Sequence, residues 1–384
     1  MRQSRVIVAP NAFKGSLSAA EAAAAVARGW RAVFPEWVIH ELPLADGGDG
    51  TTACIVQATG GRIYHKTVTG PLGGPVDAFW GLTGDGATVV VEVAAASGLA
   101  LVPPEQRDPL QATSFGTGEL IREAIASGCR TVFVGLGGSA CSDAGAGILQ
   151  ALGARLLDKH GCEIGRGAAS LHDLDSIDVD DARALLSKIN LVAGCDVDNP
   201  LFGPEGAAYV YAPQKGAKPE QLPFLDQALR HFAAVVKRDL NYDVSLLPGG
   251  GAAGGIGAGL AILGGRLVPG VETIMELTGL PALLDEGGVK LVITGEGEIN
   301  RQSLRGKVPV GVARLAQAHQ VPVLVLAGSV KLDPEEARSA GISAMLSITD
   351  GPLTLAEAMA QTAALLEKTA AQAARLLKIG LAGI

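Results

Sequence analysis

The sequence predicts an α/β protein of two domains, in which one doubly wound parallel sheet is split by an inserted α/β domain with an antiparallel or mixed sheet. Three observations predict this class. Strand and helix patterns alternate near both ends of the 384-residue chain, strands without intervening helices follow Gly60 and Gly61, and glycine-rich loops follow several strands. A chain of this length can bury two separate cores.

The first two strand–helix units lie at the start of the chain. A strand at Arg5–Ala9 precedes an alanine-rich helix, whose start is marked by Ser18 and Glu21 at the spacing of a capping box. A second strand at Trp37–Leu42 is followed by a helix that ends near Thr59. This order is typical of the beginning of a parallel sheet.

The pattern changes in the middle of the chain and returns near its end. Short strands at Arg62–Thr69, Val76–Leu82 and Thr88–Val93 are separated by glycine and proline turns, which favours an antiparallel or mixed arrangement. The C-terminal alternation contributes three further strands, so that two units at the start and three at the end give five parallel strands. Those strands are Val289–Ile293, Val321–Ala327 and Ala344–Ile348. The predicted domain limits are 1–60 with 287–384 for the parallel-sheet domain and 61–286 for the inserted domain.

The composition excludes several classes of function. The net charge of −8 and an aromatic content of 4% argue against a nucleic-acid partner, which calls for a basic face and stacking surfaces. The five cysteines are scattered without the spacing of a zinc site, which indicates a reduced, cytoplasmic protein. We expect neither a signal peptide nor a membrane partner, because the apolar runs are short.

Two glycine-rich loops predict phosphate binding. The strand Thr131–Val134 opens into Gly137, Gly138 and Ser139, followed by Asp143 and a helix of small residues. Glycines allow the backbone to approach a ligand, and the N–H groups at a helix start attract anions. A tight strand-to-helix turn is the alternative, but Pro248–Gly257 forms a second loop of the same kind. The predicted nucleotide-binding residues are Gly137, Gly138, Ser139, Lys215, Gly250, Gly251 and Gly254.

Charged residues occupy the loops that follow the strands, where ligands of open α/β sheets bind. Lys14 and Ser16 follow the first strand, Asp46 and Asp49 follow the second, and Glu296, Arg301 and Lys307 follow the first C-terminal strand. The inserted domain contributes its glycine loops, Asp196 and Lys215. We infer a cleft between the domains. For most of these residues a structural role is the competing interpretation: a solvated surface for the basic residues, helix caps for Asp46 and Asp49, and a turn for Asp196.

Nine segments of the chain resemble, in the same order, the sequence blocks of the bacterial glycerate kinases of the first type. They read NAFKGSLSA, ADGGDGT, AAASGL, SFGTGEL, GLGGSACSDAGAG, CDVDNPLFG, APQKGA, GGGAAGGIGAGL and GEGEINRQSLRGKVPVGVA. The resemblance covers essentially the whole chain. It implies a flavodoxin-like domain interrupted by a second α/β domain, and an ATP-dependent kinase of D-glycerate that usually forms 2-phosphoglycerate.

The sequence departs from the pattern of that family at several positions. Glu298 stands where the family more often has Arg, and Asn300 stands where it has Asp. Cys141 and Ser142 replace Thr and Asn, and Ala144 replaces Gly. If the family's acid at the Asn300 position binds metal or acts as a base, another carboxylate must do so here.

Together, the residues and the resemblance predict magnesium-assisted, in-line phosphoryl transfer in the interdomain cleft, with ATP and Mg²⁺ as cofactors. Lys14, with Arg301 or Lys307, is predicted to hold the glycerate carboxylate. Asp196 is the first candidate for the base that accepts the hydroxyl proton, and Asp46 is the second. The full assignment is catalytic for Asp196, Asp46 and Lys14; substrate-binding for Lys14, Ser16, Asp49, Arg301 and Lys307; and metal-binding for Glu296 and Asp143.

Three other functions stay open at this point. One is phosphorylation of O3 instead of O2 of glycerate, and another is a kinase of a different small hydroxy acid. The third is a non-catalytic, two-domain protein that binds a small acid, which needs basic residues but neither a nucleotide cradle nor metal carboxylates. The sequence leaves the oligomeric state open, with a homodimer as one option.

Overall fold

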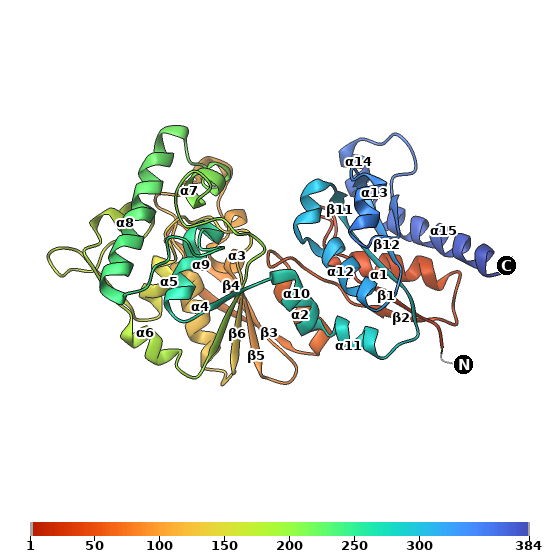
Figure 1. Ribbon diagram of the computed structural model, residues 1–384, viewed down its shortest axis with the longest axis horizontal. Helices are drawn as coiled ribbons and strands as arrows, with labels where there is room; N and C mark the ends of the chain where they lie inside the picture. Colours follow the sequence, from red (N-terminus) through yellow and green to blue (C-terminus); the bar gives the residue numbers. More distant parts are fainter. Residues whose placement is uncertain (1–2, 383–384) are drawn as a thin grey trace. The chain divides into compact units, whose positions relative to one another are not determined.

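The computed structural model describes residues 3–382 and divides into two compact units (Figure 1). The terminal unit comprises residues 1–46 and 271–384, and the central unit comprises residues 47–270. The predicted limits at residues 60 and 287 remain a prediction about domains. Both boundaries between the compact units come earlier in the chain than the predicted limits. At the first boundary, helix α2 (Thr51–Thr59) packs against strands of the central unit and therefore belongs to that unit.

The terminal unit is built on a five-stranded parallel sheet of order β13-β12-β11-β1-β2, which confirms the predicted five parallel strands. Helices α1 and α15 share a core with one face of this sheet, whereas α12 packs against β11 and β12 without joining that core. The elements are β1 (Arg5–Val8), α1 (Ala19–Arg31), β2 (Val38–Glu41), α10 (Gly270–Thr278, which begins at the unit boundary), α11 (Leu280–Asp285), β11 (Val289–Ile299), α12 (Val308–Ala318), β12 (Val323–Val330), α13 (Pro334–Ser339), β13 (Ala344–Ser347), α14 (Leu355–Ala360) and α15 (Thr362–Ala382).

Helix α1 begins where the sequence predicts. The Ser18 hydroxyl accepts a hydrogen bond from the backbone N–H of Glu21, and the Glu21 carboxylate accepts one from the backbone N–H of Ser18, which completes the capping box. Its inner face packs against α15, which lies alongside it (Figure 1). Gly29 makes this close approach possible, because a Cβ placed on it would lie 2.1 Å from the carbonyl oxygen of Glu367.

Strand β11 is longer than the sequence analysis predicts. The predicted strand ends at Ile293, but pairing with β12 continues through Ile299, which lies opposite Val330. Gly295 suits this extension because a Cβ on it would lie 2.0 Å from the carbonyl oxygen of Leu326. Glu296 and Glu298 therefore belong to a strand and not to a loop.

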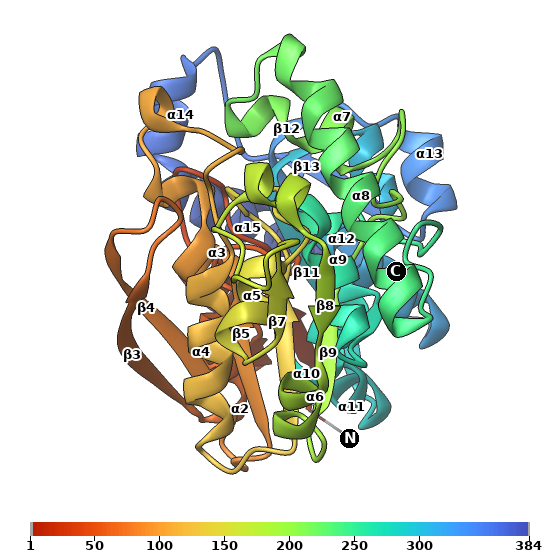
Figure 2. The ribbon, with the colours of Figure 1, turned by 90° about the vertical axis from the view of Figure 1, so that its left-hand side faces the viewer.

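The central unit contains a six-stranded mixed sheet of order β10-β9-β6-β5-β4-β3, as predicted for the inserted region. Strands β5, β6, β9 and β10 run parallel to one another. Strand β4 pairs antiparallel with both β3 and β5. Helix α4 packs against β3, β4 and β5 (Figure 2). Besides α2, the elements are β3 (Arg62–Thr69), β4 (Pro75–Leu82), β5 (Thr88–Glu92), α3 (Val93–Ser97), α4 (Phe115–Ile125), β6 (Thr131–Gly135), α5 (Ala146–Ala151), β7 (Arg155–Leu157), β8 (Ser176–Asp178), α6 (Asp180–Leu185), β9 (Asn190–Gly194), α7 (Ala207–Tyr211), α8 (Leu222–Leu240), α9 (Ala252–Ile262) and β10 (Arg266–Val268).

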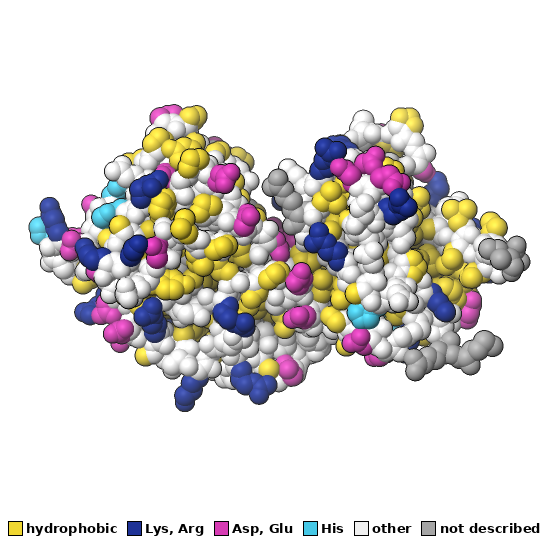
Figure 3. All heavy atoms as spheres, in the orientation of Figure 1, with side chains coloured by type: hydrophobic (Ala, Val, Ile, Leu, Met, Phe, Trp, Pro, Cys, Tyr) yellow, Lys and Arg dark blue, Asp and Glu magenta, His cyan; other side chains and the backbone are white. Residues whose placement is uncertain are grey.

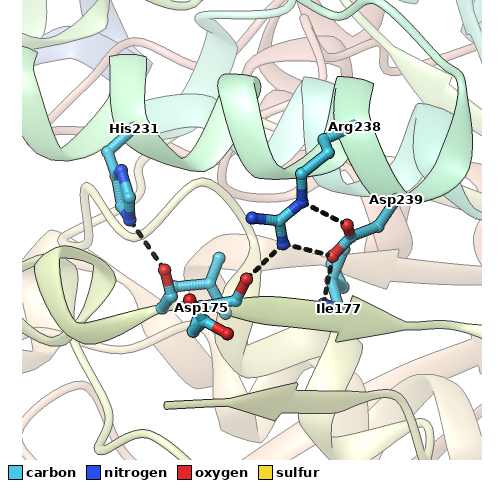
Figure 4. Close-up of polar contacts among 6 residues, drawn as sticks. Asp175, Ile177, His231, Arg238 and Asp239 are labelled. Atoms are coloured by element: carbon cyan, nitrogen blue, oxygen red, sulfur yellow. Dashed lines mark hydrogen bonds and ion pairs between the residues drawn. The ribbon is translucent and has the colours of Figure 1, made fainter. Parts of the chain in front are cut away.

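The small β7–β8 hairpin is fastened to helix α8 by polar contacts (Figure 4). The Asp239 carboxylate accepts hydrogen bonds from the backbone N–H of Ile177 at 3.0 Å and from the Arg238 guanidinium at 2.6 Å. A ring nitrogen of His231 lies 2.7 Å from the carbonyl oxygen of Leu174. The hairpin is therefore held by α8, the longest helix of the central unit, and His231 serves this contact.

Within residues 3–382, no helix combines the length and the apolar composition needed to cross a bilayer. The longest helix, α15, exposes apolar side chains along its last turns (Figure 3). Arg375 and Lys378 interrupt that apolar stretch.

Candidate active site

The topology of the terminal unit creates a switch point between β1 and β11. These strands are neighbours in the sheet, but their successors β2 and β12 lie on opposite sides of them. Ligands of open α/β sheets bind beyond the carboxyl ends of the strands at such a point. Here the loop after β1 runs along β11, because the backbone N–H of Asn11 donates to the carbonyl oxygen of Gly295 at 2.8 Å. A Cβ on Gly297 would lie 3.8 Å from the backbone nitrogen of Lys14, so the structure brings Lys14 to the end of β11 that carries Glu296.

Glu296 is a buried carboxylate at this switch point, with 5% of the residue exposed. The Ser303 hydroxyl donates to its Oε1 at 2.7 Å, and the Lys307 Nζ lies 3.9 Å from its Oε2. Burial raises the pKa of Glu296, hydrogen bonding to Ser303 and the charge of Lys307 oppose this, and the charges of Asp46 and Glu298 add to it. Asp46 is thus close enough to Glu296 for their charges to interact.

The basic candidates of the terminal unit differ in how their charge is used. Arg301 forms an ion pair with Glu336 of α13, with N–O distances of 2.9 and 3.2 Å. Lys307 is half-exposed and faces Glu296. Within the described residues, the exposed Lys14 ammonium makes no hydrogen bond or ion pair. Lys14 and Lys307 are therefore better placed than Arg301 to receive an anion.

Ser16 is placed differently from its predicted role. Its hydroxyl donates to the carbonyl oxygen of Met359 at 2.6 Å and lies 2.7 Å from the Thr362 hydroxyl. These contacts fasten the loop after β1 to the junction of α14 and α15. The geometry gives Ser16 a structural role, and substrate binding by this residue stays a prediction.

The two unusual residues after Glu296 form a local cap. Glu298 forms an ion pair with Lys331 at 2.7 Å and accepts a hydrogen bond from the Asn300 side-chain amide at 2.8 Å. These contacts lower the pKa of Glu298. The Asn300 side-chain oxygen accepts from the backbone N–H of Gln302 at 2.9 Å and starts the 3-10 helix Arg301–Arg305. Both side chains are therefore engaged in the local structure.

In the central unit, the first glycine loop packs against the loop that begins this unit. The backbone N–H of Gly137 donates to the carbonyl oxygen of Gly47 at 3.0 Å. A Cβ on Gly137 would lie 2.5 Å from the Cα of Gly48, so no larger residue fits without a shift. A Cβ on Gly138 would lie 3.6 Å from the Asp49 carboxylate. The predicted substrate residue Asp49 therefore lies beside the predicted phosphate loop.

The second glycine loop packs against the first one. A Cβ on Gly254 would lie 2.1 Å from the carbonyl oxygen of Cys141, and the backbone N–H of Ala144 donates to the carbonyl oxygen of Gly254 at 3.1 Å. Ala253, Gly254 and Gly255 have φ angles of 55°, 75° and 96°, so the regular part of α9 begins after them. The two glycine loops are therefore neighbours within the central unit.

Lys215 lies where the two glycine loops meet and is 2% exposed. Its Nζ donates to the hydroxyl of Ser139 at 2.9 Å and to the carbonyl oxygen of Cys141 at 2.6 Å. Burial lowers the pKa of Lys215 to about 8, against the opposing charges of Cys141 and Asp143. The hydrogen-bond partners of this buried cation are both neutral.

Asp143, a predicted metal ligand, is fully buried and anchors two helices. Its Oδ2 accepts hydrogen bonds from the backbone N–H of Ser114 at 2.7 Å, from the Ser114 hydroxyl at 2.9 Å and from the backbone N–H of Gly147 at 3.3 Å. Its Oδ1 accepts from the backbone N–H of Gly145 at 3.2 Å. The carboxylate therefore joins the starts of α4 and α5, and its oxygens are already used by protein donors.

Asp196, the first candidate base, is exposed and follows β9. Its Oδ1 accepts a hydrogen bond from the backbone N–H of Gly270 at 2.8 Å, which fixes the orientation of the carboxylate. The same loop reaches the second glycine loop, because the backbone N–H of Gly251 donates to the carbonyl oxygen of Asn199 at 3.0 Å. Asp196 therefore lies beyond the carboxyl end of β9, in a loop that contacts the second glycine loop.

Sequence analysis missed one buried acid, Glu92, at the end of β5. It is 2% exposed, and its carboxylate accepts hydrogen bonds from the backbone N–H groups of Thr52 at 2.6 Å and Gly50 at 3.2 Å. Burial raises the pKa of Glu92. It holds the loop that carries Asp49 at the start of α2. A carboxylate directly after the apolar run Thr88–Val91 was the signal available in the sequence.

Comparison with known proteins matches nearly the whole chain to one family. The model of the glycerate kinase family matches residues 6–378. The glycerate kinase of Bacillus subtilis is 46% identical over 98% of both chains, and the glycerate 2-kinase of Escherichia coli is 46% identical over 92% of this chain and 93% of its own. A solved structure described as glycerate kinase 2 of Salmonella typhimurium superposes with a TM-score of 0.88 at 46% identity, covering 99% of this chain and 100% of that one.

Proposed function

Since the chain belongs to the glycerate kinase family, whose named members are kinases, we propose that it transfers a phosphoryl group from ATP to O2 of D-glycerate and forms 2-phosphoglycerate. The observation that carries this proposal is the meeting of two glycine-rich loops around the buried Lys215 ammonium. A buried cation without an acidic hydrogen-bond partner favours an anionic ligand. Backbone that tolerates no Cβ favours a ligand that approaches the main chain closely, as phosphates do.

In this proposal the central unit binds the nucleotide phosphates. The backbone around the glycines would donate N–H groups to phosphate oxygens, and Lys215 would supply the charge that offsets them. The Ser139 hydroxyl holds the Lys215 ammonium in place for this role. The proposed nucleotide-binding residues are Gly137, Gly138, Ser139, Lys215, Gly250, Gly251 and Gly254.

The terminal unit would bind the acceptor acid. Lys14 and Lys307 are the proposed partners of the glycerate carboxylate, because neither is consumed by a close ion pair. Arg301 would contribute less, since Glu336 already neutralises its charge. Ser16 of the terminal unit and Asp49 of the central unit stay in the proposal as further substrate-binding residues.

The acceptor hydroxyl must lose its proton as the phosphoryl group arrives. Asp196 is the proposed base, because its carboxylate is exposed and oriented by the Gly270 N–H. Asp46 is the alternative, since its charge interacts with that of Glu296. Replacing the true base by its amide should lower kcat and leave the KM for ATP nearly unchanged.

Magnesium would be held at the switch point of the terminal unit. No group of three or more His, Cys, Asp and Glu side chains within residues 3–382 could hold a metal by itself. Kinase magnesium is, however, usually bound by one or two carboxylates together with the phosphates. Glu296 and Asp46 fit such a pair, whereas the engaged oxygens of Asp143 do not. When bound, magnesium neutralises phosphate charge and thereby favours transfer.

The proposal is tested by measuring ADP release with magnesium–ATP and a panel of small hydroxy acids, with the product identified by NMR. We expect turnover with D-glycerate and 2-phosphoglycerate as the product. Formation of 3-phosphoglycerate would assign the reaction to O3, and faster turnover of another acid would change the substrate. Binding of glycerate without any turnover would support the non-catalytic alternative.

The five free cysteines favour the proposal that the protein works in the cytoplasm.

A further inference from the structure

Arg107 is a cation that the sequence analysis did not select and whose side chain has no partner in the described part of the chain. Its backbone N–H donates to the carbonyl oxygen of Pro104, but the guanidinium makes neither a hydrogen bond nor an ion pair there. The Nε atom is buried and unpaired. Since an unmade hydrogen bond from a buried, charged donor is unfavourable, this atom indicates a missing acceptor.

The segment that carries Arg107 is fastened to the first glycine loop. The backbone N–H of Leu99 donates to the carbonyl oxygen of Gly138 at 2.7 Å, and the N–H of Ala140 donates to the carbonyl oxygen of Ser97 at 2.9 Å. An isolated antiparallel bridge joins Gly98 and Ser139. Residues 97–107 therefore lead directly from the phosphate loop to Arg107.

The other end of this segment lies against the turn that carries Lys215. Gly216 follows Lys215 with a φ of 99°, and a Cβ on it would lie 2.6 Å from the carbonyl oxygen of Arg107 and 2.8 Å from its Cβ. Arg107 and the residue after Lys215 are thus in backbone contact. Two cationic residues therefore lie on neighbouring segments of the central unit, and neither makes an ion pair within residues 3–382.

We propose that Arg107 is a second anion-binding residue of the central unit and that, together with Lys215, it binds the polyphosphate end of the nucleotide; this inference rests on the proposed kinase function. A guanidinium suits this ligand, because its planar set of donors matches two oxygens of a phosphate group. Lys215 would bind as a point charge and Arg107 as a fork.

Arg166 provides a matched control. It belongs to the same unit, and its guanidinium stacks over the Phe115 ring at 3.6 Å, so its charge is already used. The variants to compare are Arg107→Gln, Arg107→Lys and Arg166→Gln. Each is measured as the full chain, with circular dichroism and a melting temperature to verify the fold.

The probes are ATP, AMP and inorganic tripolyphosphate, with affinities measured by calorimetry and with separate KM values for ATP and glycerate. We expect Arg107→Gln to weaken ATP and tripolyphosphate by about tenfold or more, corresponding to the loss of one charged hydrogen-bonding partner. AMP affinity and the KM for glycerate should stay within about twofold. Arg107→Lys should fall between wild type and Arg107→Gln, and Arg166→Gln should resemble wild type.

The inference would be overturned if Arg107→Gln bound tripolyphosphate as tightly as wild type does. It would also be overturned if Arg107→Gln lost the same factor in affinity for AMP as for ATP. If Arg107→Gln fails to fold, the comparison of Arg107→Lys with Arg166→Gln decides instead, and equal affinities in those two would overturn it. Failure of the proposed function looks different. In that case wild type forms no ADP with glycerate, while the tripolyphosphate titration still reports on Arg107.

Discussion

The two units bury charges of opposite sign at the places where they are proposed to bind ligands. In the terminal unit the buried group is the Glu296 carboxylate, and in the central unit it is the Lys215 ammonium. Burial favours the neutral form of both, so it raises the pKa of Glu296 and lowers that of Lys215. Glu296 has a cation, Lys307, at 3.9 Å, whereas Lys215 has two neutral hydrogen-bond acceptors. The difference indicates that the Glu296 carboxylate suits a cation or a hydroxyl and that the Lys215 ammonium suits an anion, while the glycerate carboxylate is left to Lys14 and Lys307 of the terminal unit.

The units also differ in what shapes each site. Side chains at the ends of two parallel strands form the terminal site. Backbone packed on backbone forms the central site, where Gly137 and Gly254 leave no room for a Cβ. A substitution should therefore act through charge in the terminal unit and through shape in the central unit.

The largest effect is expected from Gly254→Ala. The new Cβ would collide with the carbonyl oxygen of Cys141, which Lys215 contacts, and the backbone would be strained at a φ of 75°. Overpacking and left-handed strain together cost about 2–5 kcal/mol, so kcat/KM for ATP should fall by about a hundredfold or more. Gly264→Ala is the control, because its φ is 86° and no atom lies within 4 Å of the new Cβ. Equal losses in the two variants would contradict the role of shape.

Glu296→Gln should reduce kcat by up to about a hundredfold, the lower end of the usual effect of removing one charge-stabilising group from an active site. The KM for ATP should change little, and steady-state kinetics at saturating ATP separate the two parameters. Glu298→Gln, on the same strand but paired with Lys331, is the control and should stay within about threefold of wild type. A larger loss in Glu298→Gln than in Glu296→Gln would place the critical carboxylate elsewhere.

The titration of Lys215 predicts that a rise in pH weakens ATP binding but increases the free energy of unfolding. As pH rises through about 8, the ammonium loses its proton, and the KM for ATP should rise by about tenfold per pH unit where the charged form alone binds. In the unfolded chain the lysine keeps its proton up to its ordinary pKa of 10.5. Between about 8 and 10.5 the unfolded state therefore binds more protons, and the free energy of unfolding should rise with pH relative to Lys215→Met. Parallel pH profiles in wild type and Lys215→Met would contradict this assignment.

A moderate effect distinguishes the two basic candidates of the terminal unit. Lys307→Gln should raise the KM for glycerate by about tenfold, as expected for the loss of one charged contact to a carboxylate. Arg301→Gln should raise it by about threefold or less, because Glu336 already neutralises Arg301 and the pair is exposed. The reverse order would show that Arg301 leaves Glu336 to bind the substrate.

The smallest effect is expected from Ala144→Gly. Ala144 has a φ of 55°, in the left-handed region that favours glycine. Removing the Cβ relieves backbone strain in the folded state, and this gain slightly exceeds the loss that comes from the larger conformational entropy of the unfolded chain. The substitution should therefore raise the free energy of unfolding by less than about 1 kcal/mol. Urea denaturation measures this change, and a clear destabilisation would mean that the buried Cβ of Ala144 contributes more through packing.

Much of the fold could be predicted from local signals in the sequence. The five parallel strands follow from the alternation of strand and helix patterns, and the start of α1 follows from Ser18 and Glu21. The extent of β11 could not be predicted, because Gly295 and Gly297 have low strand propensity. Pairing with β12 overrides that propensity.

The candidate site divides in the same way. The two glycine loops could be recognised in the sequence, but their proximity could not be predicted, because the first follows strand β6 whereas the second lies between helices α8 and α9. The hydrogen-bond partners of individual polar side chains could not be predicted. Asp143 accepts from the backbone N–H of Ser114, and the Ser16 hydroxyl donates to the carbonyl oxygen of Met359, and both partners are distant in sequence. A sequence lists donors and acceptors but does not show which of them the folded chain itself satisfies.

One measurement separates the two units most directly: titration of ADP without divalent cations into wild type, Lys215→Met and Glu296→Gln. Without metal, ADP should depend on the cationic site of the central unit alone. We expect Lys215→Met to lose about tenfold or more in affinity, while Glu296→Gln binds within about twofold of wild type. Undiminished binding by Lys215→Met, or a loss confined to Glu296→Gln, would contradict the assignment of the nucleotide phosphates to the central unit.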